Sequence, residues 1–325
     1  MANQQNERKT DNRARSCIIY SGIIWNIDFN SYICRLHIYN AIQKFMFKIL
    51  ERVMLTPNIC KMVVSAPRIA EAAKPGQFLI VRSDEKGERI PLTISDYDRE
   101  NGTVTIVTQL IGASSAAIIS KAEGEFFRDV VGPLGNPSAF VDKTDEELKG
   151  QRYIFIAGGV GTAPVYPQAK WLHERGIAVD VIIGAKTKDL LIYKEELASA
   201  CDNLYLCTDD GSEGFHGMVT GLLEKLVNEG KEYTQAVSIG PMIMMKFCTL
   251  TCKKLGIPED VSLNMLMVDG TGMCGACRVT VAGKVKFACV DGPEFNGYDV
   301  DFDEAMRRLG QYRPEETEVK SKMGI

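Results

Sequence analysis

The chain has 325 residues, of which 45% are hydrophobic and 25% are charged, and its formal net charge at pH 7 is -4. These values are typical of a globular protein long enough for two domains. The balance argues against nucleic acid as a partner, because binding phosphates requires an excess of Lys and Arg. No apolar run approaches the ~20 residues that span a bilayer, so we expect no membrane span.

Ten cysteines could indicate a secreted disulfide framework, but their distribution argues against one. Three of them, Cys274, Cys277 and Cys289, stand at the spacing of metal or cluster ligands. Others lie scattered in apolar segments: Cys60, Cys201, Cys207, Cys248 and Cys252. Buried free thiols in a reducing compartment explain this pattern better, so we expect a cytoplasmic protein.

The first 45 residues differ from the remainder. They carry six Lys and Arg against three Asp and Glu, so +3, which leaves -7 for residues 46–325. A basic start and the apolar stretch from Cys17 to Ile27 are compatible with a signal peptide, but Asn26 and Asp28 interrupt it and no small-residue cleavage site follows. We expect instead a disordered leader or an overextended start over residues 1–45, with the folded protein beginning at Met46.

Residues 46–148 predict an antiparallel β-barrel. The stretch PGQFLIVRS reads as a Pro-Gly turn that leads into a strand. The longer stretch GERIPLTISDYDRENGTVTIVTQLI has two β-branched runs on either side of DRENG, which is a hairpin signal. Short strands separated by turn residues are typical of such a barrel.

At Gln151 the pattern changes to alternating strands and helices. RYIFIAGG is a continuous apolar run, as in a parallel strand buried on both faces, and the helix-like APVYPQAKWLHERG follows it. Strands and helices then alternate as far as VSLNML. The alternation predicts an α/β domain with a doubly wound sheet over residues 149–265. A cysteine-containing segment, 266–298, and a polar tail, 299–325, complete the chain.

The stretch IFIAGGVGTAPVYP places a glycine-rich loop between a strand and a helix. Glycines let the backbone approach a pyrophosphate, and the helix N-terminus supplies unpaired N–H donors. A purely structural turn is the alternative, because tight strand–helix turns need glycine anyway. The context favours dinucleotide binding. The loop residues expected to bind are Gly158, Gly159, Gly161, Thr162, Ala163 and Pro164.

Three charged residues bear on the choice of dinucleotide. Asp209 and Asp210, in TDDGS, could hydrogen-bond a ribose as acidic residues do for NAD, or could act as capping or turn residues. Lys186, in GAKTKD, could contact a 2′-phosphate, although an exposed loop lysine is its more ordinary role.

A barrel followed by GGVGTAPVYP and then by IGPMIMM resembles the ferredoxin–NADP reductase superfamily. Its members bind a flavin on the barrel and a nicotinamide dinucleotide on the α/β domain, and they pass a hydride between the two. For this chain the resemblance implies FAD and NAD(H), with Gly240, Pro241 and Met242 on the nicotinamide side of the flavin. Packing in a helix core is the alternative for Met242, and the more ordinary role of Met244 and Met245.

The same resemblance implies a flavin site on the barrel. Where the superfamily has an Arg-x-Tyr-Ser-type motif, this chain reads ERIPLTISD, which assigns Arg89, Pro91, Leu92 and Thr93 to the flavin. The chain departs from the motif, because Arg89 stands two residues before Pro91 and Thr93 replaces serine. A guanidinium suits a pyrophosphate, but an exposed arginine at a strand end is the alternative.

The stretch LIGASSAAI resembles the flavin pyrophosphate loop of that superfamily. Small residues and hydroxyls at a helix start can form an anion site, which assigns Gly112, Ser114 and Ser115 to the flavin. An ordinary N-cap is the alternative, because serine favours that position for structural reasons.

The stretch VDGTGMCGACRVTVAGKVKFAC has the spacing of plant-type ferredoxins, which hold a [2Fe–2S] cluster with C-x4-C-x2-C…C. The four positions here are Asp269, Cys274, Cys277 and Cys289. We expect a [2Fe–2S] cluster with an Asp269 oxygen as the fourth ligand. The alternatives are a zinc site, which lacks a fourth thiolate or histidine, reduced cysteines in a hairpin, and a fourth ligand from Cys248 or Cys252.

Barrel, NAD domain and cluster segment together resemble the electron-transfer subunits of dihydroorotate dehydrogenase, over nearly all of residues 46–325. Those subunits carry four cysteines at the cluster. With aspartate first, this chain is more similar to the small (alpha) subunits of NADH-dependent ferredoxin:NADP oxidoreductases, of the sulfide dehydrogenase-like kind. That resemblance implies a heterodimer with a larger FAD and [4Fe–4S] subunit of the beta type, which engages ferredoxin and NADP, so that ferredoxin is only an indirect partner.

The expected function is electron transfer between NAD(H), FAD and the [2Fe–2S] cluster, to or from that larger subunit. The cofactors carry such chemistry, and no side chain need act as an acid or base. Two alternatives stay open at this point. One is the electron-transfer subunit of an NAD-dependent dihydroorotate dehydrogenase, in pyrimidine biosynthesis. The other is a non-catalytic redox or nucleotide sensor.

Overall fold

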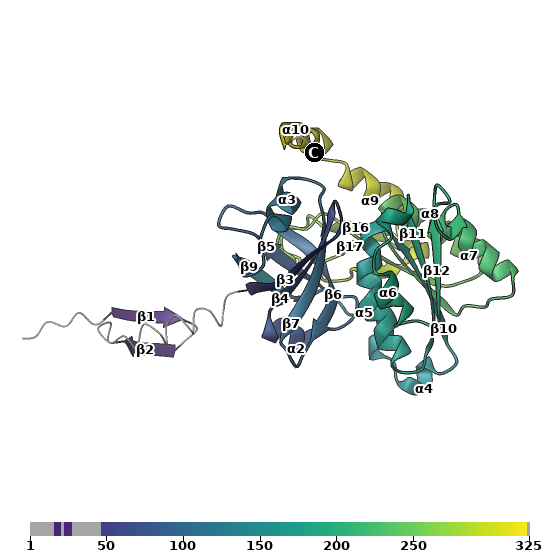
Figure 1. The fold of residues 1–325 in the computed structure, drawn as a ribbon, viewed down its shortest axis with the longest axis horizontal. Helices are drawn as coiled ribbons and strands as arrows, with labels where there is room; N and C mark the ends of the chain where they lie inside the picture. Colours follow the sequence, from purple (N-terminus) through teal and green to yellow (C-terminus); the bar gives the residue numbers. More distant parts are fainter. Residues whose placement is uncertain (1–15, 21–22, 28–46, 324–325) are drawn as a thin grey trace, which may run out of the picture. The chain divides into compact units, whose positions relative to one another are not determined.

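The computed structural model describes residues 16–20, 23–27 and 47–323. Contacts divide the chain into two units, Met1–Met46 and Phe47–Ile325. In the first unit, β1 (Ser16–Tyr20) pairs antiparallel with β2 (Ile23–Ile27) (Figure 1). The predicted leader over residues 1–45 falls mostly outside the described residues.

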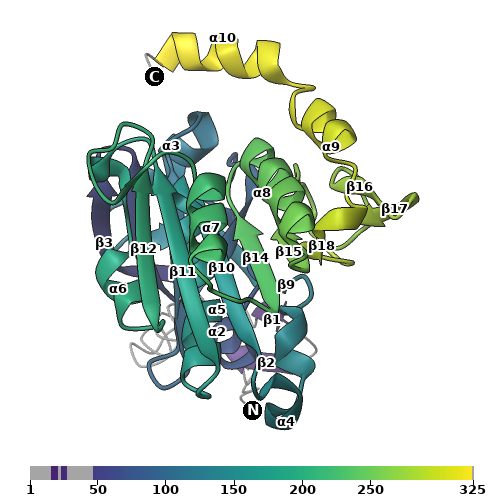
Figure 2. The same cartoon turned by 90° about the vertical axis from the view of Figure 1, so that its right-hand side faces the viewer.

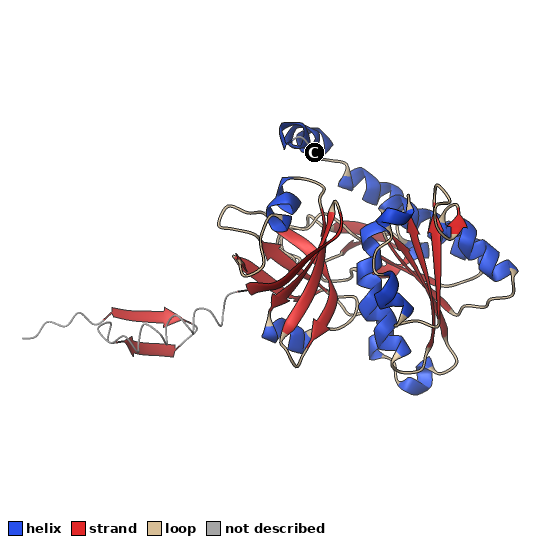
Figure 3. Ribbon diagram, viewed as in Figure 1, coloured by secondary structure: helices blue, strands red, loops and turns tan. Residues whose placement is uncertain are grey.

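A seven-stranded antiparallel sheet curls into a nearly closed barrel, in the order β8-β3-β4-β7-β6-β5-β9 (Figure 3). Its strands are β3 (Phe47–Thr56), β4 (Ile59–Ser65), β5 (Phe78–Arg82), β6 (Arg89–Asp98), β7 (Thr103–Gln109), β8 (Phe126–Phe127) and β9 (Asp129–Leu134). Two short helices accompany them, α2 (Pro67–Ala72) and α3 (Ala113–Ile119). The sheet confirms the predicted barrel.

The barrel core follows from the period of two along its strands. In β7, Val104 and Ile106 are buried, and in β4 Met62 and Val64 are buried, because alternate side chains of a strand point to the same face. Leu79 of β5 completes this core. The β-branched hairpin recognised around DRENG is the β6–β7 pair, which the structure forms in antiparallel register.

A second seven-stranded sheet has the order β13-β12-β11-β10-β14-β15-β18 and is parallel except between β15 and β18. Its strands are β10 (Arg152–Gly158), β11 (Ala178–Ala185), β12 (Asn203–Thr208), β13 (Phe215–His216), β14 (Gln235–Ile239), β15 (Glu259–Ser262) and β18 (Glu294–Asn296). The helices are α4 (Asp145–Leu148), α5 (Thr162–His173), α6 (Lys194–Ala198), α7 (Val219–Asn228) and α8 (Met242–Leu255).

Helices cover both faces of this sheet, as a doubly wound fold requires (Figure 2). Phe155 of β10 packs with Leu172 of α5 in one core cluster. Ile154 of the same strand packs with Leu223 of α7 and Cys248 of α8 in another. The predicted α/β domain is therefore confirmed. The antiparallel edge strand β18 was not predicted, and it comes from the cysteine-containing segment.

The rest of that segment forms a separate hairpin of β16 (Arg278–Val281) and β17 (Lys284–Phe287). The helices α9 (Phe302–Leu309) and α10 (Arg313–Met323) follow. Short 3-10 turns are η1 (Ala139–Asp142), η2 (Gly159–Gly161), η3 (Lys188–Leu190) and η4 (Gly297–Asp299). One core cluster joins Ile80 of the barrel, Met245 of α8 and Cys277 beside the hairpin. In the described part of the chain, no helix is both long and apolar enough to span a membrane.

Candidate functional site

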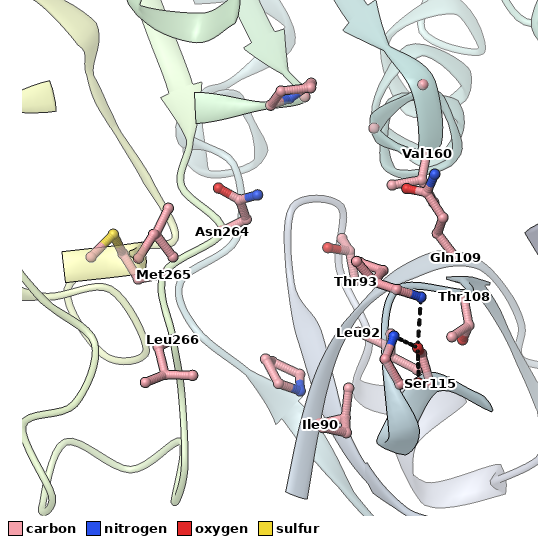
Figure 4. Close-up of a pocket in the computed structure, with 18 of the residues that line it drawn as sticks. Ile90, Leu92, Thr93, Thr108, Gln109, Ser115, Val160, Asn264, Met265 and Leu266 are labelled. Carbon is pink, nitrogen blue, oxygen red and sulfur yellow. Dashed lines mark hydrogen bonds between the residues drawn. The ribbon is translucent and has the colours of Figure 1, made fainter. Parts of the chain in front are cut away.

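A cavity of about 2260 Å³ lies between the barrel and the α/β sheet. Figure 4 shows part of it, where Leu92 and Thr93 of β6 lie near Thr108 of β7, and Gln109 of β7 lies beside Val160 of the glycine loop. The chain between β15 and β16 has two parts, a connector (residues 263–268) and the cysteine loop (residues 269–277). The connector forms a further wall of the cavity, with Asn264, Met265 and Leu266 (Figure 4). Three parts of the sequence therefore meet at one cavity.

All seven residues that the sequence assigned to the flavin line this cavity: Arg89, Pro91, Leu92, Thr93, Gly112, Ser114 and Ser115. Their hydrogen bonds differ. The Ser115 hydroxyl accepts hydrogen bonds from the backbone N–H groups of Ile111 and Gly112 at 2.8 and 2.9 Å. Gly112 is the N-cap of α3, so Ser115 bonds back to it from the third helical position, as in a capping box. The Ser114 hydroxyl bonds the Glu88 carboxylate. The pyrophosphate role of the two serines stays a prediction.

Two polar residues of the cavity were missed from the sequence. Thr108 is 3% exposed, and its hydroxyl has no hydrogen-bond partner. A buried polar group without a partner costs about 1–3 kcal/mol, so a ligand that bonds this hydroxyl would be favoured. Asn264 presents its amide to the same cavity (Figure 4). The residues therefore fit a large, mostly apolar ligand with a few polar groups, as a flavin is. The position of Thr108 on the inward face of β7, after Ile106, was the available signal.

The glycine loop lies where the order of the parallel strands reverses. β10 ends at Gly158 and its neighbour β14 ends at Ile239, and ligands of doubly wound sheets bind at this point. A Cβ on Gly161 would press into the backbone carbonyl of Ile239, so only glycine allows the loop to approach β14. The close approach fits a loop that must also leave room for a pyrophosphate.

The predicted dinucleotide residues separate into two groups. Lining the cavity are Gly158, Gly159, Gly161, Pro164, Asp209, Gly240 and Pro241. Thr162 and Ala163 are completely buried beneath the loop, and Met242 packs in a core cluster instead of lining the cavity. Met244, which was expected in the helix core, does line the cavity.

The two aspartates of TDDGS have different surroundings. Asp209 is exposed and lines the cavity, as does Lys186. The Asp210 carboxylate accepts hydrogen bonds from the hydroxyl and the backbone N–H of Ser212 at 2.6 and 3.0 Å. Those two bonds hold the pKa of Asp210 below its ordinary value. Asp210 therefore has the turn role that was its alternative interpretation, and of the two aspartates only Asp209 lines the cavity. The ribose contact of Asp209 stays a prediction.

Two of the four predicted cluster ligands come together at the cysteine loop. The sulfurs of Cys277 and Cys289 are 3.3 Å apart and both residues are 2% exposed, while Cys274 is exposed. Burial raises the pKa of the Cys289 thiol above its ordinary value. Within the residues that the structure describes, no three His, Cys, Asp or Glu side chains are arranged to hold a metal ion.

The Asp269 side chain is hydrogen-bonded to the backbone of the same loop. Its carboxylate accepts the backbone N–H groups of Thr271 and Cys274 at 2.7 and 2.8 Å, and these bonds lower its pKa. Cys248 and Cys252 are completely buried in the α8 core cluster, so they do not extend the loop's ligand set. Two adjacent thiols, a third cysteine and a carboxylate are donors that suit iron in a cluster.

Arg89 contacts the start of this loop. Its Nε donates to the Val268 carbonyl at 3.1 Å, and its Nη2 donates to the Asp269 carbonyl at 3.3 Å. Its Nη1 lies 3.7 Å from the Asp129 carboxylate on β9. The arginine thus joins β6 to the cysteine loop, which its sequence position did not indicate.

A nearly closed barrel, a doubly wound sheet with a glycine loop at its switch point, and a cysteine loop beside their shared cavity define a ferredoxin–NADP reductase-like oxidoreductase. A family model for the iron–sulfur cluster binding domain of dihydroorotate dehydrogenase B matches residues 264–301. The structure reported for an NADH-dependent reduced ferredoxin-NADP oxidoreductase superposes with a TM-score of 0.79 at 42% identity, over 86% of this chain and 98% of that one.

Two curated relatives are also similar. A Thermotoga maritima protein described as "Dihydroorotate dehydrogenase B (NAD(+)), electron transfer subunit homolog" is 47% identical over 269 residues, which are 83% of this chain and 92% of the relative. A Clostridium beijerinckii protein described as "Uncharacterized protein in adh 3'region" is 60% identical over 272 residues, with the same coverage. The chain belongs to the family of dihydroorotate dehydrogenase B electron-transfer subunits and their homologues.

Proposed function

We propose that this chain passes electrons between NAD(H), FAD and a [2Fe–2S] cluster, as one subunit of a larger oxidoreductase. The observation that carries the proposal is the single cavity, which runs from the glycine loop across β6 and β7 to the connector that leads into the cysteine loop. When bound, the dinucleotide and the flavin exchange a hydride, and the flavin and the cluster exchange single electrons. The chain's own residues bind and orient these groups.

On the dinucleotide side, the loop from Gly158 to Pro164 holds the pyrophosphate with backbone N–H groups at the start of α5. Asp209 hydrogen-bonds a ribose, which favours NAD over its 2′-phosphorylated form. Gly240 and Pro241 leave room for the nicotinamide against the flavin, and Met244 closes that wall.

On the flavin side, Thr108 and Asn264 supply hydrogen-bonding groups. Ile90, Leu92 and Leu266 supply apolar walls that exclude water (Figure 4). Cys274 and Cys277 of the cysteine loop and Cys289 after β17 would hold the cluster, with Asp269 in the fourth position. The family model over residues 264–301 supports this assignment of the loop.

The test is reconstitution of the full chain with FAD, iron and sulfide under anaerobic conditions. The loaded protein should be yellow-brown and should reduce a redox dye with NADH. Protein that stays colourless after reconstitution would overturn the proposal. Protein that binds NADH without any turnover, even when an acceptor is supplied, would favour a nucleotide or redox sensor instead.

The partner we propose is a larger FAD and [4Fe–4S] subunit that works with ferredoxin and NADP. Asp269 in the first ligand position supports it, as does the similarity to an NADH-dependent reduced ferredoxin-NADP oxidoreductase. The second candidate is a dihydroorotate-oxidising subunit, which the names of the cluster-domain model and of the Thermotoga maritima relative favour. Affinity capture of the native chain separates them, by the size and the cofactors of the subunit that is recovered.

We place the complex in the cytoplasm. The eight cysteines from Cys60 to Cys289 are free thiols, which is compatible with a reducing compartment. Fractionation of the native cells would test this location.

A further inference from the structure

Two arginines hold the cysteine loop by its backbone. At the start of the loop, Arg89 of the barrel donates to the carbonyls of Val268 and Asp269 at 3.1 and 3.3 Å. At the middle of the loop, Nη2 of Arg308 in α9 donates to the Ala276 carbonyl at 3.2 Å. Bonds from a charged donor to a carbonyl are stronger than neutral ones, so each contact restrains the loop.

The Arg89 side chain is itself fixed on the barrel. The Asp129 carboxylate of β9, which is separated from β6 by β5, lies 3.7 Å from Nη1, and the other two nitrogens contact the loop carbonyls. One guanidinium therefore contacts β9 and the loop from its position on β6. Its planar fork, with donors in fixed directions, is suited to hold two successive carbonyls.

The next residue of the loop packs directly on the barrel. Gly270 has a φ of +77°, and a Cβ there would lie 2.5 Å from Cδ1 of Ile80 and 2.9 Å from Cδ1 of Leu134. The backbone of the loop thus lies against β5 and β9 immediately after the residues that Arg89 holds. Arg89 and Gly270 together attach the first turn of the loop to the barrel.

The connector before this turn is a wall of the cavity. Along it, Leu263, Met265 and Met267 are buried in the core, while the residues between them alternate outward as in an extended strand. The outward residues Asn264, Leu266 and Val268 line the cavity, and so do the buried residues between them, so the whole connector forms this wall. Arg89 therefore binds the chain at the point where the cavity wall ends and the cluster-binding loop begins.

We propose that Arg89 is a positioning residue for electron transfer, whose guanidinium fixes the cysteine loop against the flavin-binding barrel. This proposal rests on the proposed function. Electron transfer between two centres slows steeply as the gap between them grows, so a loop that leaves the barrel slows the step from flavin to cluster. The prediction that Arg89 binds the flavin phosphate is the competing role, and the two roles predict different defects.

The test compares Arg89→Leu and Arg89→Lys with Arg99→Leu in the full chain. Arg99 is the matched control, because its guanidinium also donates to two backbone carbonyls, those of Glu71 and Ala73 at the end of α2, at 3.2 and 2.8 Å, but it does not line the cavity. Arg89→Lys keeps the charge that a phosphate needs and loses the fork that holds two carbonyls. It is the conservative variant if Arg89→Leu folds poorly.

Three quantities are measured: the FAD and iron content, the rates at which NADH reduces the flavin and then the cluster, and hydrogen exchange of residues 266–274. We expect both Arg89 variants to retain FAD and iron. We expect cluster reduction to slow about tenfold relative to flavin reduction, since small displacements of reacting groups are costly. Exchange of residues 266–274 should become faster in the Arg89 variants alone, whether or not the cofactors are loaded.

Loss of FAD from Arg89→Leu, with FAD retained by Arg89→Lys, would overturn the proposal in favour of the phosphate role. Unchanged cluster reduction and unchanged exchange in both variants would overturn it as well. If the wild-type chain does not reduce its cluster with NADH at all, the proposed function fails. The exchange measurement on the full chain still decides whether Arg89 restrains the loop.

Discussion

The glycine loop and the cysteine loop are both short, glycine-rich turns beside the same cavity, but they are held in different ways. The glycine loop is fixed by its neighbours in one sheet, since Ala157 pairs with Ile239 and Gly161 packs under the Ile239 carbonyl. The cysteine loop is bound by Arg89, which lies 179 residues from Val268 along the chain. A local sequence pattern therefore locates both loops but explains the geometry of only the first.

The largest effect is expected at the cysteine loop. Cys277→Ser should abolish the iron content and the cluster absorbance, because a ligand at the buried sulfur pair is lost. FAD content should persist, since this cysteine does not line the cavity. Cys201→Ser, at a buried cysteine of the α/β domain, is the control and should keep its iron. An unchanged cluster in Cys277→Ser would mean that the cysteine loop does not bind it.

A larger side chain in the glycine loop should clash with the neighbouring strand. In Gly161→Val the new side chain meets the backbone of Ile239, which cannot move as a flexible side chain can. We expect a loss of about 3 kcal/mol of folding free energy and no measurable NADH binding. Urea unfolding and NADH titration measure the two effects. Gly221→Ala in α7 is the control, because a Cβ there meets only ordinary contacts with Phe215. Wild-type NADH affinity in Gly161→Val would contradict the close approach.

A buried carboxylate in the α/β sheet, that of Glu259 on β15, should make the free energy of unfolding depend on pH. Glu259 is 1% exposed, bonds the Ser238 hydroxyl with one oxygen and leaves the other without a partner. Burial raises its pKa to about 7. The folded protein therefore holds this proton more tightly than the unfolded chain, and the free energy of unfolding falls as pH rises from about 4.5 to 7.

Glu259→Gln removes that dependence. Relative to wild type, its free energy of unfolding should gain up to about 3 kcal/mol between pH 4.5 and pH 8. Because burial also raises the pKa of Glu294 to about 7, variant and wild type are compared at each pH by urea unfolding. An equal pH dependence in both proteins would mean that Glu259 ionises normally.

The smallest effect separates the two aspartates beside the dinucleotide site. Asp209→Ala should weaken NADH binding roughly tenfold, the loss of one hydrogen bond to a charged group. Asp210→Ala should leave NADH affinity unchanged, because its carboxylate is bonded to Ser212. Isothermal titration of both variants measures the contrast. A larger loss in Asp210→Ala would reverse the assignment.

The sequence predicted the features that depend on local patterns and missed those that depend on contacts between distant segments. The barrel, the doubly wound sheet, the strand–glycine–helix turn and the cysteine spacing all depend on residues close together in the chain. Thr108 was missed because its missing hydrogen-bond partner becomes visible only when β6, β7 and the connector surround it. The carbonyl contacts of Arg89 and the edge strand β18 were missed because both are pairings between distant segments. The bond from Ser212 to Asp210 was local, and the turn TDDGS had offered it as an alternative.

Rapid-freeze EPR of the reconstituted full chain, mixed anaerobically with NADH, follows the electrons from the flavin to the cluster. We expect the flavin absorbance to bleach first and the signal of a reduced [2Fe–2S] cluster to appear next, without any partner subunit present. A flavin that is reduced while the cluster stays silent on every timescale would contradict an electron path from this cavity to the cysteine loop.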